Sequence, residues 1–158
     1  MNINIICVGK IKEKYFSEAI SEYSKRLSRF VKLNIIEVTD EKIPDNASEK
    51  EMEAIKQKEG EKILSKLPPS SFTVTLCVEG KELSSLDLAK KIADISMISS
   101  NITFIIGGSL GLCDAVKSRS QLRLSFGQIT FPHQLIRVVL LEQLYRVFKI
   151  NNNETYHK

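Results

Sequence analysis

The sequence predicts an α/β fold, with a mostly parallel sheet of five to six strands and helices on both faces. Short apolar runs typical of strands alternate along the chain with longer segments whose apolar residues recur at helical spacing. Strands that alternate with helices usually lie parallel and are covered on both faces. The 158 residues are expected to form one domain, 1–158, large enough to bury about two-thirds of its unfolded surface.

The pattern begins with a strand at residues 3–8, where a continuous apolar run predicts burial on both faces. Over residues 15–30 the apolar side chains recur every three or four positions, which predicts a helix. A second apolar run of strand length follows at residues 33–38. The first third of the chain therefore predicts a strand, a helix and a strand.

A capped helix and a third strand come next. Ser48 and Glu51 fit a capping box, in which the hydroxyl accepts a hydrogen bond from the first turn and the carboxylate accepts one from the cap residue. A helix is expected from there to about residue 66, where a Pro-Pro dipeptide ends it. Residues 72–78 are expected to form a strand, and the EGK sequence at 79–81 is expected to turn the chain.

The last part of the chain predicts two further strands and three helices. Ser84 and Asp87 form a second capping pair, which opens a helix. A proline at the first turn, Pro132, favours the start of the final helix. Strands are expected at residues 102–106 and 121–126, with a short helix between them at 112–118. The final, long helix is expected at residues 132–150.

Two loops that follow the fourth and fifth strands contain four of the seven glycines. The first glycine loop is GGSLG at residues 107–111, and the second glycine loop is GQITFPH at residues 127–133. The ends of these two strands are therefore expected to lie close together and to present backbone N–H and C=O groups. Glycine has no Cβ that would keep a ligand away from those groups. The sequence predicts a small-molecule site lined largely by backbone.

Commoner site chemistries do not fit these loops. A dinucleotide fingerprint needs glycine at position 106, where the chain has Ile106, and no P-loop sequence occurs. Ser109 stands in GGSLG rather than GxSxG, so no nucleophile elbow is expected. No metal site or disulfide framework is expected, because no ligand cluster has metal spacing and the three cysteines form no CxxC pair. Cys7 and Cys77 lie in apolar runs and are expected to be buried thiols.

Positive charge is concentrated at the C-terminal end of the chain. Residues 117–158 hold seven Lys or Arg against two Glu, whereas the preceding residues sum to −1. A nucleic acid is the inferred partner, because phosphate neutralisation is the main sequence-independent source of affinity; a solvated basic face is the alternative. Lys10, Lys12 and Lys14 follow the first strand and are further candidates for RNA contact, although loop lysines are usually just solvated.

The chain carries no signal for a membrane. No run approaches the roughly 20 apolar residues of a membrane span, and no signal-peptide pattern occurs at the N-terminus. A cytoplasmic protein without a membrane partner is therefore expected.

The sequences IIGGSLG, LSFGQITFPHQLIRVVLLEQLYRVFKI and the closing TYHK resemble the SPOUT, or alpha/beta-knot, RNA methyltransferases. The similarity is greatest to the bacterial enzymes that methylate N3 of a pseudouridine in large-subunit rRNA, and it runs nearly end to end from INIICVGKIKEKY. It implies S-adenosylmethionine as cofactor, a homodimer, and helix 69 of 23S rRNA in the assembled ribosome as substrate. It also implies a C-terminal trefoil knot, although knots are rare in general.

The resemblance assigns the cofactor contacts to the ends of three strands. They correspond to Leu76, Gly107, Phe126, Gly127, Gln128, Ile129, Thr130 and Phe131. Taken singly, Leu76, Ile129 and Phe131 are typical core residues, and the glycines are typical of turns. Only their joint placement makes a pocket. S-adenosylmethionine has an electrophilic methyl group, so the protein need only position it and exclude water.

The family's LYRxF and terminal YHK motifs assign Arg146, Tyr156 and His157 as candidate catalytic residues. They are expected to position RNA or to help deprotonate the pseudouridine imide. The alternative for Arg146 is a helix-surface ion pair with Glu142, and a histidine next to a terminus is ordinarily disordered. His133, at a helix N-terminus, is expected to be neutral and hydrogen-bonded.

The long helix at residues 132–150 is apolar around more than one face, so it needs cover beyond the sheet. A second copy of the chain is expected to supply that cover. Arg146 or His157 of either subunit is then available to each active site. Two other functions stay open from the residues alone: a non-catalytic RNA-binding module, and a SPOUT methyltransferase with a different RNA target.

Overall fold

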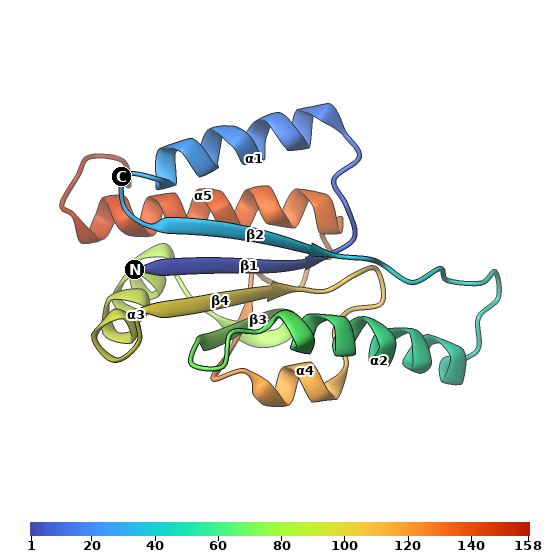
Figure 1. The fold of residues 1–158 in the computed structure, drawn as a ribbon. Coiled ribbons are helices and arrows are strands. Elements are labelled where there is room, and N and C mark those ends of the chain that lie inside the picture. The colour runs from blue at the N-terminus through green and yellow to red at the C-terminus, as the bar shows by residue number, and fades with distance from the viewer.

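The computed structural model describes residues 1–158 and contains five strands and five helices in strict alternation (Figure 1). Their bounds are β1 Asn2–Val8, α1 Lys14–Leu27, β2 Lys32–Val38, α2 Glu49–Lys66, β3 Phe72–Glu82, α3 Ser85–Ile98, β4 Asn101–Ile106, α4 Asp114–Arg119, β5 Leu122–Ser125 and α5 His133–Asn151. The strands form one sheet in the order β2-β1-β4-β3-β5. Every neighbouring pair is parallel, which confirms the predicted α/β class.

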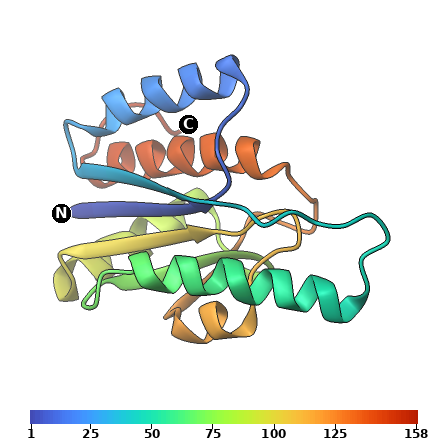
Figure 2. The same ribbon diagram turned by 45° about the vertical axis from the view of Figure 1, so that its right-hand side comes forward.

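The helices form a layer on each side of the sheet, as Figures 1 and 2 show for α1 and α5 on one side and α2 and α4 on the other. Side chains alternate in direction along a strand. Ile3, Ile5 and Cys7 of β1 therefore join the larger apolar cluster with α3 and α5. Ile6 and Val8 of the same strand join the smaller cluster, to which α2 and α4 contribute.

The predicted helix starts are confirmed where they depend on capping. Ser48 Oγ accepts a hydrogen bond from the Glu51 N–H at 3.2 Å, and the Glu51 carboxylate accepts one from the Ser48 N–H at 2.7 Å. Ser84 Oγ accepts from the Asp87 N–H at 3.1 Å in the same way. These bonds join residues three apart, so the local sequence is enough to specify them.

The expected turn at EGK is wrong. Strand β3 continues through these residues to Glu82, and its register against β5 shifts between Leu76 and Lys81. A Cβ on Gly80 would lie 2.7 Å from the backbone carbonyl carbon of Leu124, so glycine is required where the irregular strand approaches its neighbour. The chain is diverted here by strand pairing and does not reverse.

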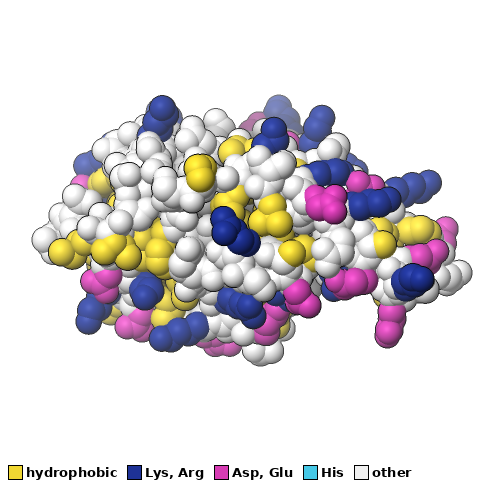
Figure 3. Space-filling model, turned by 60° about the horizontal axis from the view of Figure 1, so that its bottom comes forward, with side chains coloured by type: hydrophobic (Ala, Val, Ile, Leu, Met, Phe, Trp, Pro, Cys, Tyr) yellow, Lys and Arg dark blue, Asp and Glu magenta, His cyan; other side chains and the backbone are white.

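The surface over α2 and α4 carries no patch of one charge. Figure 3 views the molecule from this side and shows Lys or Arg and Asp or Glu side chains interleaved across it. Lys56 pairs with Glu53 and Lys62 pairs with Glu41, at 2.8 and 2.7 Å. Such a surface is typical of a solvated helix layer.

Arg137 of α5 is buried and holds the start of that helix against the sheet. Its Nη2 donates to the carbonyl oxygens of Val8 and Gly9 at 2.9 and 2.7 Å, and its Nη1 donates to the Glu37 carboxylate at 3.0 Å. Only 2% of the side chain is exposed. A residue that the sequence suggested as part of a basic surface therefore joins α5 to the carboxyl ends of β1 and β2.

Arg137→Met is expected to lower the free energy of unfolding by about 3 kcal/mol, because the carbonyl groups at the end of β1 lose their donors. Urea denaturation measures the change. Arg123→Met is the matched control, since Arg123 lies exposed on β5 without an ion pair, and its effect is expected to stay within about 0.5 kcal/mol. Equal stabilities for the two variants would contradict the structural role of Arg137.

Candidate active site

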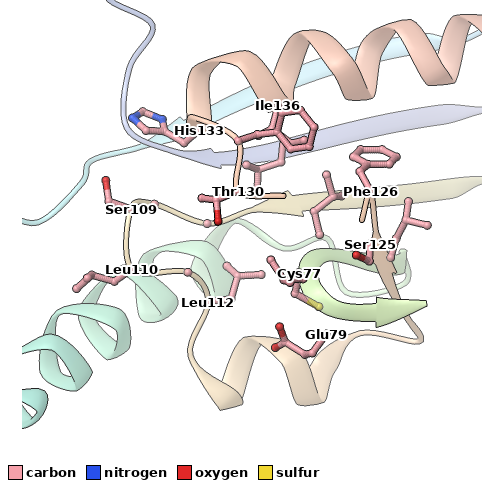
Figure 4. Close-up of a pocket in the computed structure, with 18 of the residues that line it drawn as sticks. Cys77, Glu79, Ser109, Leu110, Leu112, Ser125, Phe126, Thr130, His133 and Ile136 are labelled. Atoms are coloured by element: carbon pink, nitrogen blue, oxygen red, sulfur yellow. The ribbon is translucent and has the colours of Figure 1, made fainter. Parts of the chain in front are cut away.

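A cavity of about 790 Å³ lies at the carboxyl edge of the sheet, between the two glycine loops. Figure 4 labels residues from four of its walls, which are the later part of β3, the loop after β4, the segment at the end of β5 and the first turn of α5. Residues from these walls include Cys77, Glu79, Ser109, Leu110, Ser125, Phe126, Thr130, His133 and Ile136. The size and the mixed apolar and peptide lining are typical of a small-molecule site.

The cavity collects all but one of the residues assigned to the cofactor. Those that line it are Leu76, Gly107, Phe126, Gly127, Ile129, Thr130 and Phe131. Gln128 does not line it, although its neighbours do. Three strand ends therefore meet at one cavity, as expected from a parallel sheet, and the individual cofactor contacts stay a prediction.

The first glycine loop closes on itself. The Gly111 N–H donates to the Gly108 carbonyl oxygen at 3.0 Å, and Gly111 has a φ of +84°, which favours glycine. A Cβ on Gly107 would lie 2.9 Å from the carbonyl carbon of Gly111. Gly107 is therefore needed for the loop's own shape as well as for space beside a ligand.

The second glycine loop leaves peptide groups free at the cavity. Gly127 has a φ of +107°, and its N–H donates to Ser125 Oγ at 3.1 Å. The N–H groups of residues 128–131 donate to no protein acceptor. Residues 128–130 are exposed and residue 131 is partly buried, so these N–H groups are open to a ligand that presents hydrogen-bond acceptors, such as a purine ring.

His133 is a cavity residue whose surroundings differ from the expectation. Its Nδ1 is buried and has no hydrogen-bond partner, so the expected structural hydrogen bond is absent. Burial, followed by the nearby Arg137 charge, lowers the pKa of the imidazole. A neutral ring is thus favoured mainly by burial.

The cavity also contains residues that sequence reasoning did not single out as site residues. Lys117 and Glu79 form an ion pair at its wall, and this hydrogen bond lowers the pKa of Glu79. Cys77 is half-buried in the wall rather than in the core, and burial raises the pKa of its thiol. Cys77 and Glu79 lie within β3 and Lys117 within α4, and no local sequence signal marks them as cavity residues.

The three catalytic candidates lie together. Arg146 Nε and Nη2 donate to Glu142 Oε1 at 3.1 and 2.6 Å, and the guanidinium carbon lies 4.7 Å from the centre of the Tyr156 ring. Arg146 Nη1 lies 3.4 Å from His157 Nδ1. The helix-surface pair with Glu142 therefore occurs, and the same arginine also contacts both tail residues. We call Glu142, Arg146, Tyr156 and His157 the tail cluster.

The tail cluster does not line the cavity of its own chain. Ile136 does line it, and ten residues of α5 separate Ile136 from Arg146, which is about 15 Å along a helix. One chain therefore carries the cofactor cavity and the tail cluster at separate places on α5.

Much of the positive charge at the C-terminal end is paired inside the molecule. The ion pairs are Lys117–Glu79, Arg137–Glu37, Arg146–Glu142 and Lys149–Glu154. Only Arg119, Arg123 and Lys158 of the seven basic residues have no such partner. The local charge excess therefore overstates the basic surface that is available to RNA.

No three or more His, Cys, Asp or Glu side chains are grouped so that they could hold a metal ion. None of the helices has the length and apolar character needed to cross a membrane.

The fold and the cavity match one class of enzyme. A family model described as "Predicted SPOUT methyltransferase" matches residues 1–157, so the chain belongs to the SPOUT methyltransferase family. This confirms the resemblance and the alpha/beta-knot fold class. The family implies a methyl donor of the S-adenosylmethionine type.

Particular relatives are similar over their whole length. The chain is 56% identical to Ribosomal RNA large subunit methyltransferase H of Clostridioides difficile (strain 630) and 58% identical to the protein of that name from Clostridium novyi (strain NT). Each alignment spans 159 residues and covers 100% of both chains.

Solved structures share the fold at low sequence identity. A probable methylase family protein from Haemophilus influenzae Rd KW20 superposes with a TM-score of 0.55 at 13% identity, over 99% of this chain and 70% of that one. The tRNA (m1G37) methyltransferase from Aquifex aeolicus gives 0.53 at 13% identity, over 93% and 70%. At this identity the likeness shows the fold alone.

Proposed function

We propose that the protein transfers a methyl group from S-adenosylmethionine to N3 of pseudouridine 1915 in helix 69 of 23S rRNA, in the cytoplasm and on the assembled ribosome. The observation that carries the proposal is the backbone-lined cavity in which the family's cofactor positions meet. The whole-length relatives support rRNA of the large subunit as the substrate class.

The cavity fits the proposed cofactor. The free peptide N–H groups at 128–131 suit the adenine ring, and Leu76, Ile129 and Phe131 offer apolar contact to it. Gly107 and Gly127 let the ligand approach the backbone closely. When bound, S-adenosylmethionine supplies an electrophilic methyl group, so the protein's part is to hold the acceptor in line and to exclude water.

The tail cluster supports a role in handling the RNA. Pseudouridine N3 becomes a good nucleophile only when its proton leaves. Arg146 is permanently charged and suits a phosphate or a developing imide anion. Burial, followed by the Glu142 charge, raises the pKa of Tyr156, so this phenol stays protonated and serves as a hydrogen-bond donor. Arginine N–H groups only donate, so this contact is a hydrogen bond when His157 Nδ1 is the acceptor.

A homodimer is part of the proposal, because α5 leaves an apolar surface uncovered. Leu135, Val138 and Val139 are only partly buried and belong to neither apolar cluster of the chain. They recur at helical spacing, so they share one side of α5. A two-fold partner over this surface would cover it and would carry a second tail cluster towards the cavity.

Sedimentation equilibrium is expected to give about twice the chain mass of 17.9 kDa at micromolar concentration. Val138→Glu is expected to shift the protein towards monomer, because a charge on the uncovered surface opposes association. Lys91→Glu is the control, since it introduces the same negative charge at an exposed position on α3. A stable and active wild-type monomer would contradict the dimer.

The function is tested by mapping 23S rRNA from a strain that lacks the gene. The methyl group on the helix 69 pseudouridine should disappear and should return when the wild-type gene is restored. If the modification persists while S-adenosylmethionine still binds the purified protein, the RNA target is a different one. If the folded protein gives no calorimetric response to S-adenosylmethionine, the methyltransferase function is rejected and the alternative function, a non-catalytic RNA-binding module, is favoured.

A further inference from the structure

The loop between β1 and α1 is fixed at several points although it contains no regular structure. We call residues 9–13 the lysine loop. The Gly9 N–H donates to the Val38 carbonyl oxygen at 2.8 Å, and the Gly9 carbonyl oxygen accepts from Arg137 at 2.7 Å. The N–H groups of Lys12 and Glu13 donate to Gln134 Oε1 at 2.9 and 3.5 Å. The backbone is therefore held by β2 and by the first turn of α5.

The same contacts place the lysine loop beside the cavity. Gln134 directly follows His133, which lines the cavity, and Arg137 lies about one turn further along α5. A Cβ on Gly9 would lie 3.2 Å from the His133 ring, and Gly9 has a φ of +85°. The loop thus packs against the residue at the cavity wall, and glycine is needed for that approach.

The side chains of this loop are free while its backbone is fixed. Lys10 and Lys12 are exposed and make no ion pair within 4 Å. Lys14, at the start of α1, lies 3.6 Å from Glu18 with both side chains well exposed, so water screens that pair. Three acids lie nearby: Glu13 in the loop, Asp40 beside Gly9, and Glu37, whose carboxylate accepts from the Ile11 N–H at 3.4 Å and pairs with Arg137. None of them forms an ion pair with a lysine of the loop.

We propose that Lys10 and Lys12 contact phosphate groups of the RNA on either side of the nucleotide that enters the cavity. This inference rests on the proposed function, since it takes rRNA as the partner. Phosphate contacts set the position and orientation of a nucleic acid. A loop whose backbone is already fixed loses little conformational freedom on binding, so its two charges act at low entropic cost. Most basic residues at the C-terminal end are already paired with carboxylates, so the unpaired charges of Lys10 and Lys12 are the ones left beside the cavity to bind RNA phosphates.

The test measures binding of wild-type and variant proteins to 70S ribosomes from the deletion strain, at several salt concentrations and without turnover. In the Lys10→Gln/Lys12→Gln variant, the slope of log affinity against log salt is expected to fall by about one per lysine. Its affinity at low salt is expected to fall about tenfold or more, while its affinity for S-adenosylmethionine and its melting temperature stay at wild-type values.

Lys90→Gln/Lys91→Gln is the matched control, because it removes the same charge from exposed, unpaired positions on α3. It should keep the wild-type slope. The proposal is overturned if the lysine-loop variant keeps the wild-type slope, if the control loses as much, or if the wild-type protein does not bind ribosomes. Ribosome binding that depends on Lys10 and Lys12, together with an intact methylation pattern in the deletion strain, would support the surface and reject the proposed target.

Discussion

Gly107→Val is expected to abolish binding of S-adenosylmethionine. A Cβ at this position would lie 2.9 Å from the carbonyl carbon of Gly111 and 3.1 Å from Leu112 Cδ2, so the branched side chain displaces the first glycine loop and fills part of the cavity. A loss of more than about 3 kcal/mol in binding is expected, which is more than about 100-fold in Kd. Isothermal titration calorimetry measures it directly.

The strands and helices of this variant should survive, because the loop lies outside them. Leu112, which the new side chain meets, belongs to the smaller apolar cluster, so a modest loss of stability is expected as well. Gly107 does not have a positive φ, so the substitution adds no strain of that kind. Circular dichroism and urea denaturation check the fold. Ser109→Ala is the control in the same loop, since it removes only a hydroxyl, and it should bind within a few-fold of wild type. Wild-type affinity in folded Gly107→Val would count against this cavity as the cofactor site.

Elements specified by nearby residues were predictable from the sequence. The five strands follow from apolar runs, and the starts of α2 and α3 follow from capping pairs three residues apart. The EGK prediction failed because the course of β3 depends on β5, more than 40 residues later. A Gly in a polar tripeptide has the same local signal in a turn and in an irregular strand.

The position of the site could be predicted from its two glycine loops. The surroundings of individual side chains could not, where they depend on residues far away in the sequence. Arg137 resembles a surface charge until its partners, Val8, Gly9 and Glu37, are known. Glu59 belongs to a helix of interleaved charges, yet it is 5% exposed, and its carboxylate lies 2.8 Å from where a Cβ on Gly108 would be. Burial raises the pKa of this carboxyl. Such pairings depend on packing between elements, which periodicity does not describe.

A heterodimer of one Gly107→Val subunit and one His157→Ala subunit is expected to keep about half of the wild-type activity, if each site of the two-fold dimer uses the loops of one chain and the tail of the other. The physical reason is the separation on α5, where Arg146 lies about 15 Å along the helix from Ile136 at the cavity of its own chain. In that heterodimer the wild-type loops of the His157→Ala subunit meet the wild-type tail of the Gly107→Val subunit. One complete site therefore remains, and the other carries both changes.

Co-expression with two affinity tags yields the mixed dimer, and methyl transfer to ribosomes from the deletion strain measures its activity. Each homodimer is the control and should be inactive, because both of its sites carry one change. If sites were complete within single chains, the heterodimer would contain one subunit with a damaged cofactor loop and one with a damaged tail, and no intact site would exist. Activity no higher than that of the homodimers would therefore reject the shared site, whereas activity near half of wild type requires residues from two chains.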